Sequence, residues 1–320
     1  MTDVLPGHPK RSPNHPPDGV RTPNKTPAAP GPRFRRRGLP RRPRLLGRGA
    51  RTPNYPAGLG SLIWLGIVGL PLYVLVTATF QTRDGYIDDG PLALPDHPTL
   101  ANYRRVLRSD FLSYLLNTAL VTAVCAAIVI TLSVTVGYTI VRARSRASRR
   151  IFQIFLLGLA IPSQAVVIPV YLVITKLHLY DTLLAVILPT AAFSLPVSVL
   201  ILVGTMRDID EELYESMALD GASPTRVLLQ LVVPLSRSGI STVGVMSALH
   251  AWNGFLFPLL LTQSKSNRLL TLGLYDYVGE FRVDTPALLT AVVLSILPIF
   301  LVYLFARRQL INGLMGMGGK

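Results

Sequence analysis

The chain has 320 residues, 50% of them hydrophobic, a positive mean hydropathy of +0.43 and a formal net charge of +15. This composition is typical of a membrane protein and argues against an ordinary soluble domain. Cys125 is the only cysteine, so an intrachain disulfide is excluded and cysteine-based metal or redox chemistry has no support.

Residues 1–57 form a strongly basic tail that we expect to be disordered. The tail holds 13 Lys or Arg and 13 of the 26 prolines, with Asp3 and Asp18 as its only acids. It has few long apolar side chains, so burial cannot offset the entropy cost of ordering it. Because an apolar run follows directly, the tail favours contact with anionic membrane lipid and cytoplasmic retention over nucleic-acid binding. A cleaved secretion signal is disfavoured, since further apolar runs follow.

Residues 58–320 predict an all-α membrane protein with six transmembrane helices. Six apolar runs reach the roughly 20 residues that a helix needs to cross a bilayer core. With the tail inside, the positive-inside rule agrees with a cytoplasmic turn at 142–150, which contains five arginines. Both chain ends of this multi-pass protein of the cell membrane are then cytoplasmic. The runs lie near residues 60–80, 114–140, 151–174, 182–205, 238–262 and 286–306.

No Asp, Glu, Lys or Arg falls in the apolar centre of any run. Ion-coupled carriers usually need such intramembrane groups, so their absence favours an energy source outside the membrane domain. His250, beside Trp252, is more typical of a packed residue than of a proton relay. Prolines within or near the runs predict bent helices, which either line a cavity or are structural kinks. These prolines are Pro162, Pro169, Pro189, Pro196 and Pro298.

The polar stretch 206–237, between the fourth and fifth runs, predicts a short amphipathic helix with an acidic face. Asp208 and Asp210 are suited to cap its start. Apolar residues recur at helical spacing on one side of this helix, and polar residues occupy the other side. The apolar set is Ile209, Leu213, Tyr214, Met217 and Ala218, and the polar set is Glu211, Glu212, Glu215 and Ser216.

A glycine hinge and a second helix are expected to follow. Gly221 suits the left-handed residue that ends a helix, and Ser223 with Pro224 suits the start of the next one. Pro234 is expected to end that second helix. An acidic helix is repelled by an anionic leaflet, so a soluble partner with a basic cleft is a better counterpart than lipid.

This stretch resembles the EAA loop of the permeases of binding-protein-dependent ABC importers. Glu215-Ser216-Met217, three residues, Gly221, nine residues and Leu231-Val232-Val233-Pro234 follow the family pattern Glu-Ala-Ala, x3, Gly, x9, Ile-x-Leu-Pro. Ser216 and Met217 replace the two alanines, which predicts a bulkier helix face. Segments typical of the carbohydrate branch, the second permease of maltose- or glycerol-phosphate-like systems, are Leu100-Ala101-Asn102-Tyr103, Leu116-Asn117-Thr118, Ile161-Pro162-Ser163-Gln164, Leu179-Tyr180-Asp181-Thr182, Trp252-Asn253-Gly254-Phe255 and Ile311-Asn312-Gly313-Leu314.

The resemblance implies a type I ABC importer permease fold and a multi-subunit assembly. Its expected partners are a second permease subunit, two copies of a cytoplasmic ATPase subunit and an extracytoplasmic solute-binding protein. The loop 209–222 would act as a coupling helix that inserts into the ATPase. The residues expected to make this coupling are Glu215, Ser216, Met217, Asp220, Gly221 and Ala222.

The chain itself is not expected to be an enzyme. It contains no phosphate-binding G-x-x-x-x-G-K-[ST] loop, so ATP hydrolysis would belong to another subunit. No catalytic, cofactor or metal site is predicted. The expected cargo is a sugar or oligosaccharide, and the substrate path is not assigned to residues. An amino acid, a peptide or a polyol phosphate is an alternative cargo, and an ion-coupled carrier or a scaffold without transport is an alternative function.

Overall fold

The computed structural model describes residues 55–143, 145–279 and 283–316, and of residues 305–316 the backbone alone. The expectation of a disordered tail therefore lies outside the described residues, apart from 55–57, which open the first helix. The described part is helical, with a single isolated antiparallel bridge between Val278 and Val283. Its elements are α1 (Tyr55–Ala78), α2 (Arg83–Asp88), α3 (Ala101–Arg108), α4 (Phe111–Ala143), α5 (Arg146–Gly158), η1 (Ser163–Val166), α6 (Val167–Lys176), α7 (Leu183–Arg207), α8 (Glu211–Leu219), α9 (Pro224–Val227), η2 (Leu228–Val232), α10 (Val233–Leu235), α11 (Arg237–Trp252), α12 (Leu256–Leu261), η3 (Lys265–Asn267), α13 (Leu270–Gly273), η4 (Leu274–Tyr277) and α14 (Thr285–Gly316).

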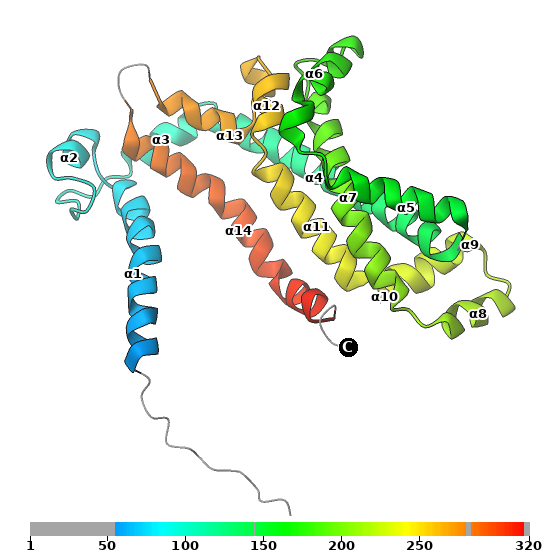
Figure 1. Ribbon diagram of the computed structural model, residues 1–320. Coiled ribbons are helices and arrows are strands. Elements are labelled where there is room, and N and C mark those ends of the chain that lie inside the picture. The colour runs from blue at the N-terminus through cyan, green and yellow to red at the C-terminus, as the bar shows by residue number, and fades with distance from the viewer. Residues whose placement is uncertain (1–54, 144, 280–282, 317–320) are drawn as a thin grey trace, which may run out of the picture. The chain divides into compact units, whose positions relative to one another are not determined.

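The described helices supply up to six membrane spans, in agreement with the sequence. Four helices are long and apolar enough to cross a membrane alone, namely α1, α4, α7 and the Thr285–Leu304 part of α14. Two bent pairs give the other two spans when each pair is counted as one. Figure 1 shows α4, α7 and α11 side by side, with α8 and α9 at one end.

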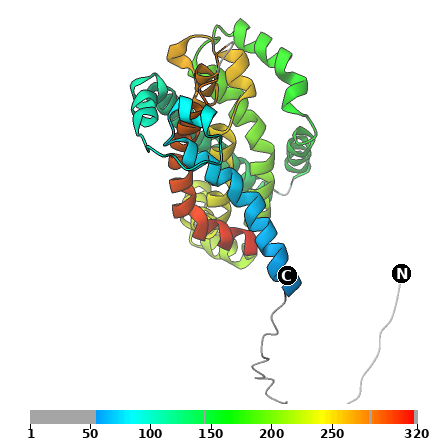
Figure 2. The ribbon, with the colours of Figure 1, turned by 90° about the vertical axis from the view of Figure 1, so that its left-hand side faces the viewer.

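The third span is broken, whereas the sequence predicted one run near 151–174. Its halves, Arg146–Gly158 and Ser163–Lys176, meet at an angle of 93°, and Figure 2 shows the change of direction. Pro162 lies in the break, where it lacks an N–H and restricts the backbone of Ile161. The bend expected from this proline is therefore present.

The fifth span also differs from the continuous run predicted near 238–262. Its helix α11 ends at Trp252, and the chain turns through Asn253 and Gly254 before α12 begins at Leu256. At its other end, α11 meets the segment Pro224–Leu235 at 79°. Prolines alone do not explain such breaks, because α7 runs unbroken through Pro189 and Pro196. The bend that the sequence expects at Pro189 and Pro196 stays a prediction, since both prolines lie within one continuous helix.

The core lies where α4, α7 and α11 pack against one another. Val121 and Val129 of α4, Leu202 of α7 and Val243 of α11 are fully buried there. Gly239 allows α11 to approach α7 closely, because a Cβ atom at this position would lie 2.5 Å from Thr205 Oγ1. The apolar window of α1, by contrast, contains no residue buried within the chain, which suits a helix that faces lipid or a partner.

Polar side chains fix the loops at the end of the bundle away from α8. Asn102 of α3 is buried and donates to the carbonyl oxygens of Thr79, at 3.0 Å, and Gln81, at 2.8 Å. Asn117 of α4 donates to the carbonyl oxygens of Ser266, at 2.7 Å, and Arg268, at 3.0 Å. These bonds join segments that are far apart in the sequence, and they set the position of the loops that the sequence places outside the membrane.

Candidate functional site

The first helix of the 206–237 loop, α8, begins at Glu211 with two acids in its first turn. Asp210 occupies its N-cap position, but its side chain makes no capping hydrogen bond. Asp208, which the sequence also favoured as a cap, is instead the C-cap residue of α7. Glu211 and Glu212 are nevertheless favourably placed at the positive end of the helix dipole.

One face of α8 packs against the main core of the bundle. Tyr214 is 3% exposed, and the half-buried side chains of Ile209 and Met217 contact the same core. Leu213 and Ala218, which the helical spacing placed on this face, are exposed instead. The inward face is thus narrower than predicted, and Met217, one of the two residues that replace the family alanines, contributes to it.

The other face of α8 is open and carries both charge and apolar surface. Glu215, Ser216 and Asp220 are exposed, and Leu219 is 89% exposed. The Ser216 hydroxyl donates to the carbonyl oxygen of Leu213 at 2.9 Å, so its hydrogen-bond donor has a partner within α8. An exposed leucine between two acids is a poor lipid anchor but a suitable contact for a protein.

Gly221 ends α8 in the left-handed conformation that the sequence predicted, with φ of 69°. The Gly221 N–H donates to the carbonyl oxygen of Ala218 at 3.1 Å, and the Ala222 N–H donates to that of Met217 at 3.0 Å. These two backbone hydrogen bonds form the Schellman motif, which favours glycine because a Cβ atom is disfavoured at positive φ. No heavy atom lies within 4 Å of the position that a Cβ atom would occupy. Backbone strain, and not crowding, therefore limits substitution here.

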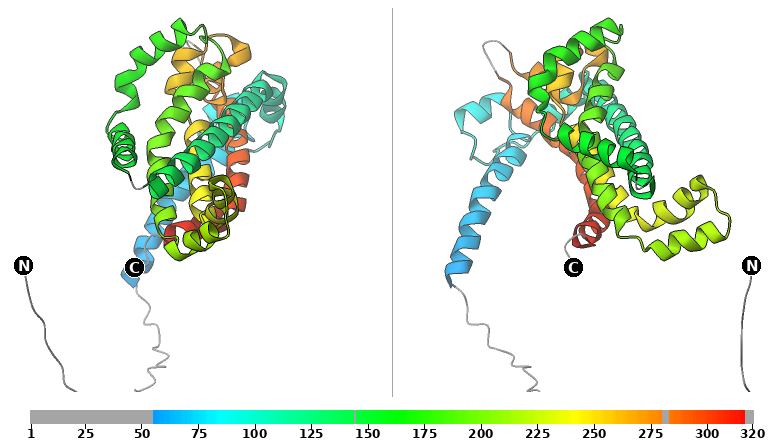
Figure 3. Two further views of the ribbon diagram at one scale, coloured as in Figure 1. Left: turned by 90° about the vertical axis from the view of Figure 1, so that its right-hand side faces the viewer. Right: turned by 45° about the vertical axis from the view of Figure 1, so that its right-hand side comes forward.

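The return segment, Pro224–Leu235, starts as predicted and ends within one residue of the predicted position. Ser223 accepts from the Arg226 N–H at 3.3 Å, and Pro224 follows at the first helical position. The helical segment ends at Leu235, one residue after Pro234, where the chain turns by 79° into α11, and it includes a π-helical stretch at Leu228–Val232 that the sequence did not predict. A wider turn just before a proline accommodates the missing N–H and the ring. Figure 3 shows α8 and this return segment side by side, extending from the bundle.

Arg142 links the turn 142–150 to α8, a contact that the sequence did not reveal. Its guanidinium lies 2.8 Å from the Glu211 carboxylate and 4.4 Å from the centre of the Tyr214 ring. The charge pair and the cation–π contact together hold the start of α8 against the end of α4. Burial raises the pKa of Tyr214, so its hydroxyl stays protonated. The only sequence signal was an arginine cluster, which the positive-inside rule had already explained.

The predicted site residues thus lie together on one short segment that projects from the bundle. It consists of α8, the hinge at Gly221 and α9, and we call it the lever. Glu215, Ser216 and Asp220 lie on its open surface, with Gly221 at the hinge, while Met217 and Ala222 pack inward. In the described residues there is no group of three or more His, Cys, Asp or Glu that could hold a metal ion. The arrangement is suited to contact with a protein.

Comparison with known proteins assigns a family to most of this fold. The family model described as "Binding-protein-dependent transport system inner membrane component" matches residues 129–312, more than half of the chain. The ORF2 protein of Caldicellulosiruptor sp. (strain Rt8B.4), named for an ABC transporter permease, is 32% identical over 79% of this chain and 92% of its own length.

Two further similarities extend to named systems. The diacetylchitobiose uptake system permease protein NgcG of Streptomyces coelicolor is 28% identical, over 78% of this chain and 83% of its own length. Among solved structures, a chain of a bacterial ABC transporter involved in the import of the acidic polysaccharide alginate has a TM-score of 0.71 at 19% identity. That match covers 79% of this chain and 96% of the other, and it shows the same fold.

Proposed function

This chain belongs to the inner membrane components of binding-protein-dependent transport systems, and on that basis we propose that it carries a sugar or oligosaccharide across the membrane. It is a multi-pass permease of an ABC importer. The observation that carries the mechanism is the lever formed by α8, Gly221 and α9, whose open surface bears Glu215 and the exposed Leu219. A separate ATPase subunit docks on this surface.

In the proposed mechanism, the ATPase moves the lever and the lever moves the spans. Gly221 fixes the angle between α8 and the return segment, and Tyr214 joins α8 to the core built by α4, α7 and α11. Because this connection is rigid, a displacement of α8 is transmitted to α4, α7 and α11. Glu215 forms a charge-assisted contact with an arginine of the ATPase, and Leu219 adds apolar area beside it.

The proposed assembly has two permeases, two copies of the ATPase subunit and an extracytoplasmic solute-binding protein. The arginine-rich turn 142–150 and the lever lie at the same end of the bundle, which supports a cytoplasmic position for both and for the chain ends. The loops held by Asn102 and Asn117 lie at the opposite end and receive the binding protein. The spans that expose apolar surface, α1 among them, contact lipid or the second permease.

A carbohydrate cargo is supported by the names of similar proteins, which refer to carbohydrates. NgcG belongs to a diacetylchitobiose uptake system, and the similar fold of known structure comes from an alginate importer. An amino acid, a peptide or a polyol phosphate is the alternative cargo. Uptake of a panel of labelled solutes, with diacetylchitobiose and an alginate oligosaccharide as the first carbohydrates, separates these classes.

The hinge provides the direct test of coupling. In Gly221→Val, a β-branched side chain must adopt φ of 69°, so the lever angle changes or α8 frays. We expect uptake and ATPase co-purification to fall at least about tenfold. Gly90→Val is the matched control, because Gly90 has φ of 85° and an equally open surrounding but lies in a loop away from α8. Wild-type uptake and co-purification in Gly221→Val would remove the lever from the mechanism.

A further inference from the structure

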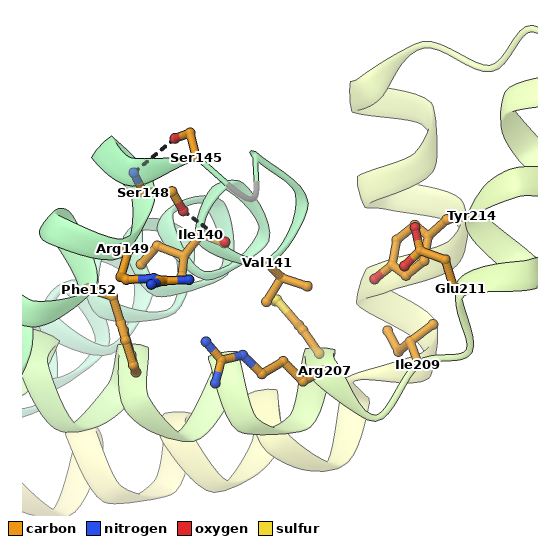
Figure 4. A pocket seen from close by; sticks show the side chains of 11 residues that line it. Ile140, Val141, Ser145, Ser148, Arg149, Phe152, Arg207, Ile209, Glu211 and Tyr214 are labelled. Carbon is orange, nitrogen blue, oxygen red and sulfur yellow. Dashed lines mark hydrogen bonds between the residues drawn. The ribbon is translucent and has the colours of Figure 1, made fainter.

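A pocket of about 440 Å³ lies beside the lever, between the arginine-rich turn and α8. Its walls are the end of α4, the first turns of α5, the end of α7 and the start of α8, as Figure 4 shows. Its apolar side includes Phe152 and Ile209. Its polar side contains Ser145, Ser148, Arg149, Arg207, Glu211 and Tyr214. The coupling mechanism proposed above gives this pocket no role.

Two guanidinium groups give the pocket a positive charge. Arg149 comes from α5 and Arg207 from the end of α7, and Figure 4 shows both groups on the same side of the pocket as Phe152. Within the described part of the chain neither forms an ion pair with an acid, whereas Arg207 stacks over the Phe152 ring with 5.4 Å to its centre. The single carboxylate in the lining, Glu211, is engaged by Arg142 at 2.8 Å. Two cations therefore face the pocket without a counter-charge of their own.

The Tyr214 hydroxyl adds a hydrogen-bond donor that lacks an acceptor. Its side chain is 3% exposed, and its oxygen has no hydrogen-bond partner among the described residues. Figure 4 shows the hydroxyl directed from α8 toward the side of the pocket formed by α5 and α7. A buried hydroxyl without a partner costs free energy, so such a group in a pocket wall indicates a missing acceptor.

The start of α5 contributes a favourable field. Ser145 caps this 13-residue helix by accepting from the Ser148 N–H at 3.0 Å. Both serines line the pocket, so the positive end of the helix dipole lies at its wall. This field alone would not define a site, but it acts in the same direction as Arg149 and Arg207.

We propose that this pocket binds a phosphate-bearing anion, with Arg149 and Arg207 contacting the phosphate oxygens and Tyr214, on the side formed by α8, donating to another oxygen of the same anion. Guanidinium groups bind phosphate through paired, charge-assisted hydrogen bonds. The volume is within the range of small-molecule sites and accommodates a phosphate together with a sugar or glycerol unit. The anion comes either from a soluble sugar phosphate or from the headgroup of an anionic lipid. In both cases it bridges α5 and α7 to α8 and so restrains the lever.

Binding can be measured on the full-length chain with the subunits that co-purify with it, in nanodiscs, without any transport assay. In one arm, glucose 6-phosphate is titrated by calorimetry into nanodiscs of phosphatidylcholine. In the other, native mass spectrometry counts the phosphatidylglycerol molecules retained after release from nanodiscs that contain this lipid. Arg149→Gln, Arg207→Gln and Tyr214→Phe are compared with Arg150→Gln, an exposed neighbour that does not line the pocket.

We expect one of the two probes to bind, and the arm that responds identifies the source of the phosphate. Arg149→Gln and Arg207→Gln each weaken that binding about tenfold, as loss of a charge-assisted contact requires. Tyr214→Phe weakens it severalfold without lowering thermal stability, since it removes a hydroxyl that has no partner. Arg150→Gln stays within about twofold of wild type. Absence of binding in both arms, or equal effects of Arg149→Gln and Arg150→Gln, overturns the proposal.

Discussion

Several single polar side chains have a structural role that their sequence segments did not disclose. Asn102, Thr118 and Asp181 lie in segments that resemble the carbohydrate branch, and each one binds backbone atoms of another segment. Thr118 accepts from the Leu270 N–H at 2.8 Å. Asp181 accepts from the Gln263 N–H at 2.8 Å and from the Ser264 N–H at 3.0 Å. These segments hold the loops at one end of the bundle, and none of these contacts requires a substrate.

Asp181 leads to a prediction about pH. The backbone N–H groups of Gln263 and Ser264 hold the pKa of the Asp181 carboxyl below its usual value of 3.8. A lowered pKa in the folded state adds stability above the unfolded pKa, and that stability is lost as the pH falls through the folded pKa. We expect Asp181→Asn to lower the Tm by roughly 2–4 °C at neutral pH. The difference from wild type should shrink below pH 3.8.

Thermal unfolding of the detergent-purified protein at several pH values checks this expectation. Asparagine also tolerates the φ of 58° found at Asp181, so the substitution tests the charge and not the backbone. Asp96→Asn, at an exposed position in another loop, serves as the control. A Tm difference that does not depend on pH would contradict the role given to the carboxylate.

The sequence could predict local features of the lever and could not predict its tertiary contacts. Gly221 and the Ser223–Pro224 pair act within a few residues, and their predicted positions are confirmed. Helical spacing alone placed Leu213 inside, because it does not show how wide a face the bundle covers. The contact of Arg142 with Glu211 joins residues 69 positions apart, and no local pattern encodes it. The pocket beside it was missed for the same reason.

The open face of α8 predicts which substitution separates docking from folding. Glu215 is exposed, so Glu215→Lys leaves the packing of Tyr214 and Met217 unchanged. It reverses the charge that we expect to meet an arginine of the ATPase. ATPase co-purification should fall at least about tenfold, which is typical of a broken charge-assisted contact. The abundance of the permease in the membrane should stay at the wild-type level.

Glu212→Lys is the matched control on the same helix, one turn farther from Gly221. It makes the same change of charge as Glu215→Lys. We expect it to change the logarithm of the affinity for the ATPase by less than a third as much as Glu215→Lys does. Pull-down of the ATPase from solubilised membranes at two salt concentrations measures both variants. Equal losses in the two would indicate a general electrostatic attraction and would remove the specific role of Glu215.

Across the whole bundle, hydropathy gave the number of spans but not their shape. Apolar runs mark where the chain can enter lipid, since each needs about 20 residues. Proline does not by itself decide whether a run is continuous, because α7 continues through Pro189 and Pro196 whereas the third span breaks at Pro162. The third span therefore bends by 93° in a region that hydropathy treats as continuous.

Because Cys125 is buried, cysteine labelling can determine the orientation of the bundle in the membrane without first replacing this residue. Cys125 is 1% exposed within the packed core, so a membrane-impermeant maleimide should not label the wild-type protein. Single cysteines can then be added at exposed positions, one in a loop and one in the first turn of α5. His97→Cys lies in the loop before α3, and Ala147→Cys lies in the arginine-rich turn. The positive-inside rule places the first outside and the second in the cytoplasm.

We therefore expect spheroplasts to label His97→Cys and to leave Ala147→Cys unlabelled, and inverted membrane vesicles to give the opposite result. Solubilised protein, in which both positions are accessible, gives the maximum signal for each variant. The reverse pattern would place the arginine-rich turn outside, together with α8 at the same end of the bundle. In that case Glu215 and Gly221 could not meet a cytoplasmic ATPase. The coupling proposal thus depends on this orientation, and the two labelling reactions decide it before any transport is measured.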